Sequence, residues 1–177
     1  IGLSKQGKYY TFGNRPYEGK ENYKCIENEV EMLEAFIDFI NRAKIQILTG
    51  WNIVGFDIPY FINRCKKLGI TKSISPIGKY WINERSGEWS IPGIAILDYM
   101  QFYKDLKFGQ PKYASYSLQF ISMAELGEGK LELDGFINDA YKRDWKKYVD
   151  YNIQDVILIE KLDLKKKFIE LSINLAH

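Results

Sequence analysis

Residues 46–67 carry the pattern that most restricts the fold: a short apolar run, a turn and an amphipathic helix. The run "IQILTGW" is typical of a buried strand that ends near Thr49. The helix is expected from about Ile58 to Lys67, with Pro59 in its first turn, where proline is tolerated. A strand that leads directly into a helix favours a layered α/β domain.

The rest of the chain continues this alternation of strands and helices. Further helices are predicted over residues 28–44, from about 98, over 115–126, and from about 144 almost to the end. Two short strands are predicted within residues 1–13 around a turn at Lys5–Gly7, and another strand just before the helix that starts near Asp98. Residues 79–93 alternate and turn over at Asn83–Gly87, which predicts an inserted β-hairpin. We therefore expect one α/β domain over residues 1–177.

Composition limits the chemistry that this chain can perform. Its one histidine is His177, which excludes most sites built on a histidine base or a serine triad. Cys25 and Cys65 have no metal-ligand spacing and are typical of reduced thiols in an intracellular protein. No apolar run approaches the length of a membrane span. Catalysis would have to rest on carboxylates, tyrosine, lysine and bound ions.

Asp57 lies where the turn meets the helix, in the segment "GWNIVGFDIPYFINR" that begins at Gly50. One interpretation is a helix N-cap, which aspartate fills well and which stabilises a helix by about 1 kcal/mol. The other is a metal ligand, since ligands collect at the carboxyl ends of strands in open α/β sheets. The two are compatible, because a capping carboxylate keeps one oxygen free, and we expect Asp57 to serve in both ways.

A second aspartate, Asp155, lies in the long C-terminal helix, within "YNIQDVILIEKL". Tyr151 precedes it by four residues, so both side chains project from one helix face. In one interpretation Asp155 is an exposed helical residue paired with a lysine, and Tyr151 is a core aromatic. In the other, an aspartate surrounded by isoleucine, leucine and valine is partly buried and needs a cation as partner.

Asp57, Asp155 and Tyr151 together suit a two-metal phosphodiesterase. In such sites two divalent ions lie about 3.5–4 Å apart, one activating a water and the other stabilising the leaving oxygen. A tyrosine hydroxyl can orient that water, a role that needs no histidine. The combination on two separate elements therefore favours a metal site over two unrelated surface aspartates.

The two segments resemble known motifs. "GWNIVGFDIPYFINR" resembles the Exo II motif, and "YNIQDVILIEKL" the Exo III motif, of the 3′–5′ proofreading exonuclease domain of family B DNA polymerases, with particular similarity to those of T-even-type phages. Between them, "SPIG", the hairpin, "GIAILDYMQFYK", "SYSL" and "GEGKLELDG" occur in the order found in this family. The resemblance implies a ribonuclease H-like fold, a mixed sheet flanked by helices, with the hairpin inserted.

The resemblance also implies roles for single residues. Asp57 and Asp155 correspond to carboxylates that hold two divalent ions, Mg²⁺ or Mn²⁺, and Tyr151 to the tyrosine of Exo III. Asn52 and Phe56 fall on motif positions that face the DNA strand end, and Lys130 is a candidate phosphate contact. The implied partners are a single-stranded 3′ end of DNA and the polymerase domains of a parent chain, in the cytoplasm of a phage-infected or bacterial cell.

One part of the family pattern is missing. Two further carboxylates belong to an Asp-x-Glu on the Exo I strand, and no Asp-x-Glu occurs in this chain, which begins with Ile1. We therefore expect a fragment that starts after Exo I. Its activity should be weak or absent, because ion affinity depends on the number and charge of the ligands. Loss of that central strand should also expose strand edges and invite pairing with a second copy.

A different class of function stays open beside the nuclease: a non-catalytic DNA-binding or structural domain that retains the fold. Lysines cluster at Lys146–Lys147 and Lys165–Lys167, and phosphate contacts there would make binding salt-dependent. The alternative for these lysines is an ordinary solvated helix face.

Overall fold

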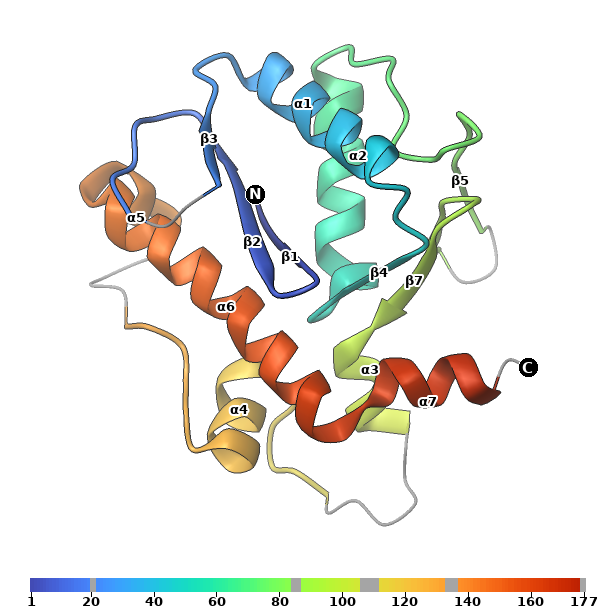
Figure 1. The fold of residues 1–177 in the computed structure, drawn as a ribbon, viewed down its shortest axis with the longest axis vertical. Coiled ribbons are helices and arrows are strands. Elements are labelled where there is room, and N and C mark those ends of the chain that lie inside the picture. The colour runs from blue at the N-terminus through green and yellow to red at the C-terminus, as the bar shows by residue number, and fades with distance from the viewer. Residues whose placement is uncertain (20–21, 84–86, 106–111, 133–136, 176–177) are drawn as a thin grey trace. The chain divides into compact units, whose positions relative to one another are not determined.

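A computed structural model describes residues 1–19, 22–83, 87–105, 112–132 and 137–175 (Figure 1). Its contacts group the chain into two compact units. Unit 1 comprises Ile1–Glu27 and Tyr103–His177, and unit 2 comprises Asn28–Phe102. Strands and helices occur in both, which confirms the α/β class. The prediction of a single domain is not tested by this grouping and stays a prediction.

Unit 1 contains a three-stranded ladder and most of the helices. Its elements are β1 (Gly2–Lys5), β2 (Lys8–Gly13), β3 (Tyr23–Cys25), α4 (Leu118–Leu126), α5 (Ile137–Arg143), α6 (Trp145–Lys166) and α7 (Phe168–Leu175). β1 and β2 are antiparallel around the predicted turn, and β3 joins β2 in parallel. The short helix α5 lies in a stretch for which no helix had been predicted.

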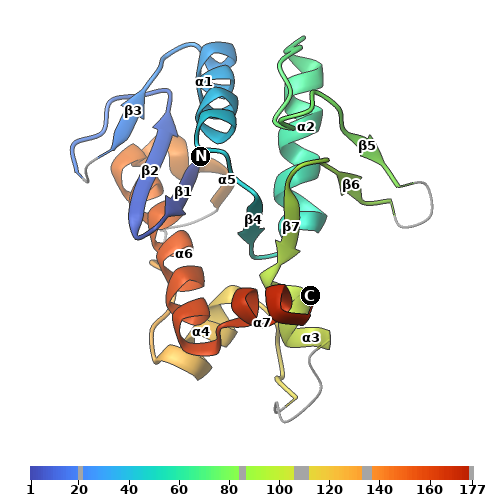
Figure 2. The ribbon, with the colours of Figure 1, turned by 45° about the vertical axis from the view of Figure 1, so that its right-hand side comes forward.

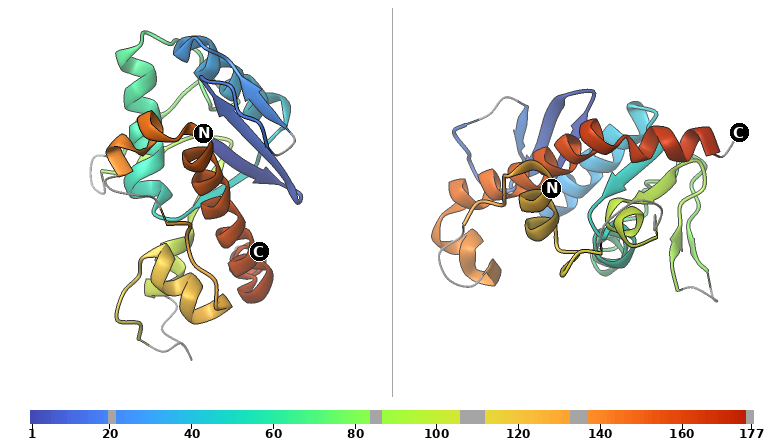
Figure 3. Two further views of the ribbon diagram at one scale, coloured as in Figure 1. Left: turned by 90° about the vertical axis from the view of Figure 1, so that its left-hand side faces the viewer. Right: turned by 90° about the horizontal axis from the view of Figure 1, so that it is seen from below.

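The long helix α6 organises unit 1, because β1, α4 and α5 all pack against it. Figure 3 shows α6 running on into α7 toward the C-terminal end. Asp144 begins the helix as predicted, since its side chain accepts a hydrogen bond from the backbone N–H of Lys147 at 2.8 Å. The buried face carries Val149, Ile153, Leu158 and Leu162 at helical spacing. This face fixes which residues of α6 turn toward solvent.

Unit 2 contains the helices α1 and α2, a parallel strand pair and an antiparallel strand pair (Figure 2). Its elements are α1 (Glu29–Arg42), β4 (Ile47–Gly50), the π-helix η1 (Ile53–Asp57), α2 (Ile58–Lys67), β5 (Trp81–Ile82), β6 (Trp89–Ser90) and β7 (Ala95–Asp98). α3 (Tyr99–Asp105) follows β7 and leads into unit 1. β4 and β7 pair in parallel, with Gly50 opposite Asp98.

Packing between α1 and α2 forms the core of unit 2. Leu33 and Ile37 of α1 meet Cys65 of α2 in one buried cluster, which Ile70 completes. Outside this cluster, Arg64 of α2 donates two hydrogen bonds to the carboxylate of Glu29, at 2.7 and 2.5 Å. This forked ion pair therefore fixes the two helices at a second point.

At the position of the predicted hairpin, β5 and β6 pair antiparallel, with Trp81 opposite Ser90 and Ile82 opposite Trp89. Residues 84–86 of its predicted turn lie outside the described residues. The indole of Trp89 contacts the ring of Tyr80 edge-on, and the ammonium of Lys66 lies 4.4 Å from the Trp89 ring. These contacts attach the hairpin to α2 through a cation–π interaction.

Candidate active site

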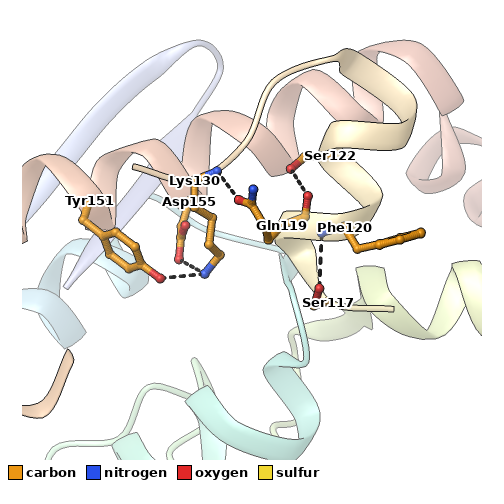
Figure 4. Close-up of polar contacts among 7 residues, drawn as sticks. All are labelled: Ser117, Gln119, Phe120, Ser122, Lys130, Tyr151 and Asp155. Carbon is orange, nitrogen blue, oxygen red and sulfur yellow. Dashed lines mark hydrogen bonds and ion pairs between the residues drawn. The ribbon is translucent and has the colours of Figure 1, made fainter. Parts of the chain in front are cut away.

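The candidate site in unit 1 is a cluster of Lys130, Tyr151 and Asp155 (Figure 4). Tyr151 and Asp155 stand one turn apart on α6, as their spacing predicted. The ammonium of Lys130 lies 2.7 Å from Oδ2 of Asp155 and 3.0 Å from the hydroxyl of Tyr151. The same ammonium lies 5.0 Å from the centre of the Tyr151 ring. One lysine thus contacts both predicted residues of α6.

The carboxylate of Asp155 is only partly satisfied. Its Oδ2 is paired with Lys130, whereas its Oδ1 is buried and has no hydrogen-bond partner among the described residues. Burial raises the pKa of Asp155 above its usual value, and the ion pair with Lys130 offsets only part of this rise. Burial alone would lower the pKa of Lys130, but its hydrogen bonds to Asp155 and Tyr151 raise it. A second cation near Oδ1 would relieve the remaining cost of burying this carboxylate.

Lys130 is positioned by α4 and by the turn that follows it. Ser117 caps the start of this helix, and Gly127 ends it in a left-handed conformation with φ of 70°. The side-chain oxygen of Gln119 then accepts the backbone N–H of Lys130 at 2.6 Å. A Cβ at Gly129 would lie only 2.6 Å from the Gln119 amide nitrogen, so a larger residue would disturb this contact. Gln119 is a supporting residue that the sequence patterns did not reveal.

The candidate site in unit 2 is the turn that carries Asn52, Phe56 and Asp57. Asn52 has φ of 59°, a left-handed conformation that asparagine tolerates better than most residues. The next five residues form a π-helix rather than the loop that the sequence predicted. Such wide turns occur often at functional sites. The π-helix also explains why Asp57 does not cap α2.

The predicted cap at Asp57 is wrong. The residue has helical dihedral angles, and its exposed carboxylate accepts no capping hydrogen bond within α2 in the described part of the chain. The physical reason is that the chain is already helical upstream, so the N–H of Ile58 is bonded to the carbonyl of Ile53. A side-chain cap is needed only where a helix begins with unpaired amides. Its role as a metal ligand is untested and stays a prediction.

Phe56 presents its ring to solvent beside Tyr60. The two rings are stacked with an interplanar angle of 12° and centroids 6.1 Å apart, and each residue is 63% exposed. Large exposed aromatic faces of this kind can stack on unpaired bases.

Asp98, at the carboxyl end of β7, is a further site residue that sequence reasoning missed. Its carboxylate accepts the backbone N–H groups of Asn52, Val54 and Met100 at 3.0, 3.2 and 3.0 Å. A signal for it existed, because Asp98 follows a predicted strand directly, and Asp57 also follows one.

The predicted residues therefore fall into two groups, Lys130, Tyr151 and Asp155 in unit 1 and Asn52, Phe56 and Asp57 in unit 2. Within the described residues, no group of three or more histidine, cysteine, aspartate or glutamate side chains is arranged to hold a metal ion. In that same part of the chain, no helix is both long and apolar enough to cross a membrane.

Residues 6–121 match the model of the exonuclease domain of DNA polymerase family B, so the chain belongs to this family. Two phage proteins, the DNA-directed DNA polymerases of Escherichia phage RB69 and Enterobacteria phage T4, are each 36% identical to it over 164 residues. DNA polymerase 1 of Aeropyrum pernix is 30% identical over 163 residues, covering 90% of this chain and 16% of that protein. The aligned part covers 88% of this chain but 18% of each phage polymerase.

Proposed function

We propose that this chain is the proofreading domain of a DNA-directed DNA polymerase, hydrolysing the terminal phosphodiester at a single-stranded 3′ end with two divalent ions. Its membership of the exonuclease family supports this proposal. The observation that carries it is the half-buried carboxylate of Asp155, with one oxygen on Lys130 and the other without a hydrogen-bond partner. Such an arrangement is costly in a purely structural role.

Asp155 and Asp57 are the residues that we propose as ligands of Mg²⁺ or Mn²⁺. The fit rests on chemistry: both ions prefer carboxylate oxygens, and Oδ1 of Asp155 is buried without a partner. When bound, the ions supply charge neutralisation at the phosphate and a more acidic water. With only these two carboxylates the ions are held weakly, and we propose that hydrolysis by this chain alone is slow.

The other side chains act on the substrate in this proposal. The Tyr151 hydroxyl accepts a hydrogen bond from Lys130, which leaves its own proton available to orient a water or a phosphate oxygen. Lys130 offers a positive charge to the phosphate. The exposed ring of Phe56 stacks on a base at the strand end, and Asn52 faces the same strand.

A second candidate function is a DNA-binding or structural domain without catalysis. It is favoured by one observation, the ion pair at 2.7 Å in which Lys130 already neutralises part of the Asp155 charge. In either case the proposed partners are DNA and the polymerase domains of a longer chain, within the cytoplasm. Pairing of two copies through strand edges stays a prediction, with β1 and β3 at the edges of their ladder in the described residues.

Hydrolysis of a 5′-labelled single strand in Mn²⁺ tests the proposal. We expect slow shortening from the 3′ end by the wild-type chain and none by Asp155→Ala. DNA binding that both proteins share, without cleavage by either, would instead support the non-catalytic function. Cleavage that persists in Asp155→Ala would contradict the assignment of the site.

A further inference from the structure

The carboxylate of Asp98 connects the end of β7 to the start of the turn that carries Phe56 and Asp57. Because β4 and β7 pair in parallel with Gly50 opposite Asp98, the chain leaves β4 directly beside this carboxylate. Oδ1 accepts the N–H groups of Asn52 and Met100, and Oδ2 accepts that of Val54. Three amides from two segments thus converge on one side chain.

These hydrogen bonds act where the backbone is least able to stabilise itself. Asn52 has a left-handed backbone conformation, and the π-helix begins at the next residue. The N–H groups of Asn52 and Val54 therefore come before the first N–H that is hydrogen-bonded within that helix, and they need another acceptor. Unpaired amides and a left-handed residue each cost free energy, which the charged acceptor of Asp98 offsets. The path of the chain into residues 53–57 therefore depends on Asp98.

We infer that Asp98 is a positioning residue for the candidate site of unit 2, holding the turn so that Phe56 and Asp57 point as the reaction requires. This inference rests on the proposed function. We do not propose Asp98 as a metal ligand, because its two oxygens accept three backbone hydrogen bonds of at most 3.2 Å, which occupy most of their lone-pair sites. It acts through the backbone of the turn.

The test compares Asp98→Asn with a matched substitution in the same strand pair. Asparagine keeps one acceptor oxygen and turns an NH₂ group toward at least one backbone amide. The control is Thr49→Val, because the Thr49 hydroxyl donates to the carbonyl of Leu97 at 2.8 Å across the same ladder. A role confined to stabilising the strand pair would give both variants the same behaviour.

Two readouts by NMR, both on folded protein, follow the turn itself. Amide exchange of Asn52 or Val54 should be faster in Asp98→Asn by about 10- to 100-fold, and unchanged in Thr49→Val. Titration with Mn²⁺ alone should broaden the resonances around Asp57 in the wild type, and should require about 10- to 100-fold more Mn²⁺ in Asp98→Asn.

Three outcomes can be told apart. Unchanged amide exchange of Asn52 and Val54 in Asp98→Asn would overturn the inference. Equal losses of amide protection and of Mn²⁺ binding in Asp98→Asn and Thr49→Val would also overturn it, because Asp98 would then only stabilise the strand pair. A wild-type chain that binds no Mn²⁺ near Asp57 would contradict the proposed function, while the exchange measurement would still decide the role of Asp98.

Discussion

Replacing Asp155 by leucine is expected to reduce hydrolysis at least about 100-fold, the loss typical of removing one preorganised electrostatic group. The substitution should also lower the free energy of unfolding by about 1–2 kcal/mol, because it leaves Lys130 without its carboxylate. This is less than the 3–5 kcal/mol typical of a fully buried pair, since the two side chains keep 26% and 27% of their surface exposed.

Adding Lys130→Met to Asp155→Leu should restore stability without restoring activity. The double variant removes both charges and the buried Oδ1 that has no hydrogen-bond partner. The raised pKa of Asp155 also predicts that removing this carboxylate together with its partner relieves a cost to stability. A carboxyl group whose folded pKa lies above its unfolded pKa lowers stability at neutral pH. This cost disappears as the pH falls below the unfolded pKa.

Urea unfolding of the wild type, both single variants and the double variant measures this coupling. We expect the double variant to match or exceed the wild type in stability. If its destabilisation equals the sum of the two single losses, the two side chains do not couple, and the expected rescue by the second substitution would be contradicted.

Glu125→Gln is the second substitution with a large expected effect, about 2–3 kcal/mol of stability at pH 7. Glu125 lies in the last turn of α4, and its side chain is 8% exposed. Lys166 and Lys165 of α6 lie 2.6 and 3.1 Å from its two oxygens, and the Tyr113 hydroxyl donates to the same carboxylate. Burial alone would raise the pKa of Glu125, but these hydrogen bonds lower it from 4.5 to about 2. At about 1.4 kcal/mol for each pKa unit, this fall corresponds to about 3.5 kcal/mol, and screening by solvent at the partly exposed residue reduces the expected loss to about 2–3 kcal/mol.

The sign of the pH dependence follows from the direction of the shift. Because the folded pKa of Glu125 lies below its ordinary value, its contribution is complete above pH 4.5 and is lost as the pH falls toward about 2. Thermal unfolding between pH 7 and pH 2 should therefore show a smaller loss of stability in Glu125→Gln than in the wild type.

Glu128→Gln is the matched control for this experiment. Glu128 pairs with Lys161 at 2.5 Å, but its side chain is 47% exposed. An exposed pair contributes little, so we expect a change of at most about 0.5 kcal/mol. Equal losses of stability in Glu125→Gln and Glu128→Gln would contradict the expectation that the buried carboxylate of Glu125 contributes more than an exposed ion pair.

The helices of this chain could be predicted where their signals are local. Asn28, Ser117 and Asp144 each accept a hydrogen bond from the first turn of their helix, and each lies near the start of a helix that the sequence predicts, over 28–44, over 115–126 and from about 144. Asp57 has the same local signal and does not cap. Its outcome was set by the π-helix upstream, which no residue pattern in the sequence distinguishes from a loop.

The candidate site was predictable as a set of residues, and less so as a set of contacts. The helical spacing placed Tyr151 and Asp155 on one face, and the motif resemblance named Lys130. That Lys130 contacts both of them depends on packing between α4 and α6, which periodicity does not specify. Asp98 was missed for a similar reason, since its partners are backbone amides on another segment, which any residue type can supply.

Three acidic residues of α6 restrict where insertions and deletions can occur in this helix. Asp150 accepts a hydrogen bond from Tyr17, Asp155 from Lys130, and Glu160 from Ser4 and Tyr9. Successive members are five residues apart, which turns each by about 140° around the helix axis relative to the one before. Inserting or deleting one residue between positions 150 and 160 would turn one end by about 100° against the other, so that the three contacts could not form together. Length variation in this helix is therefore confined to the stretches before Asp150 and after Glu160.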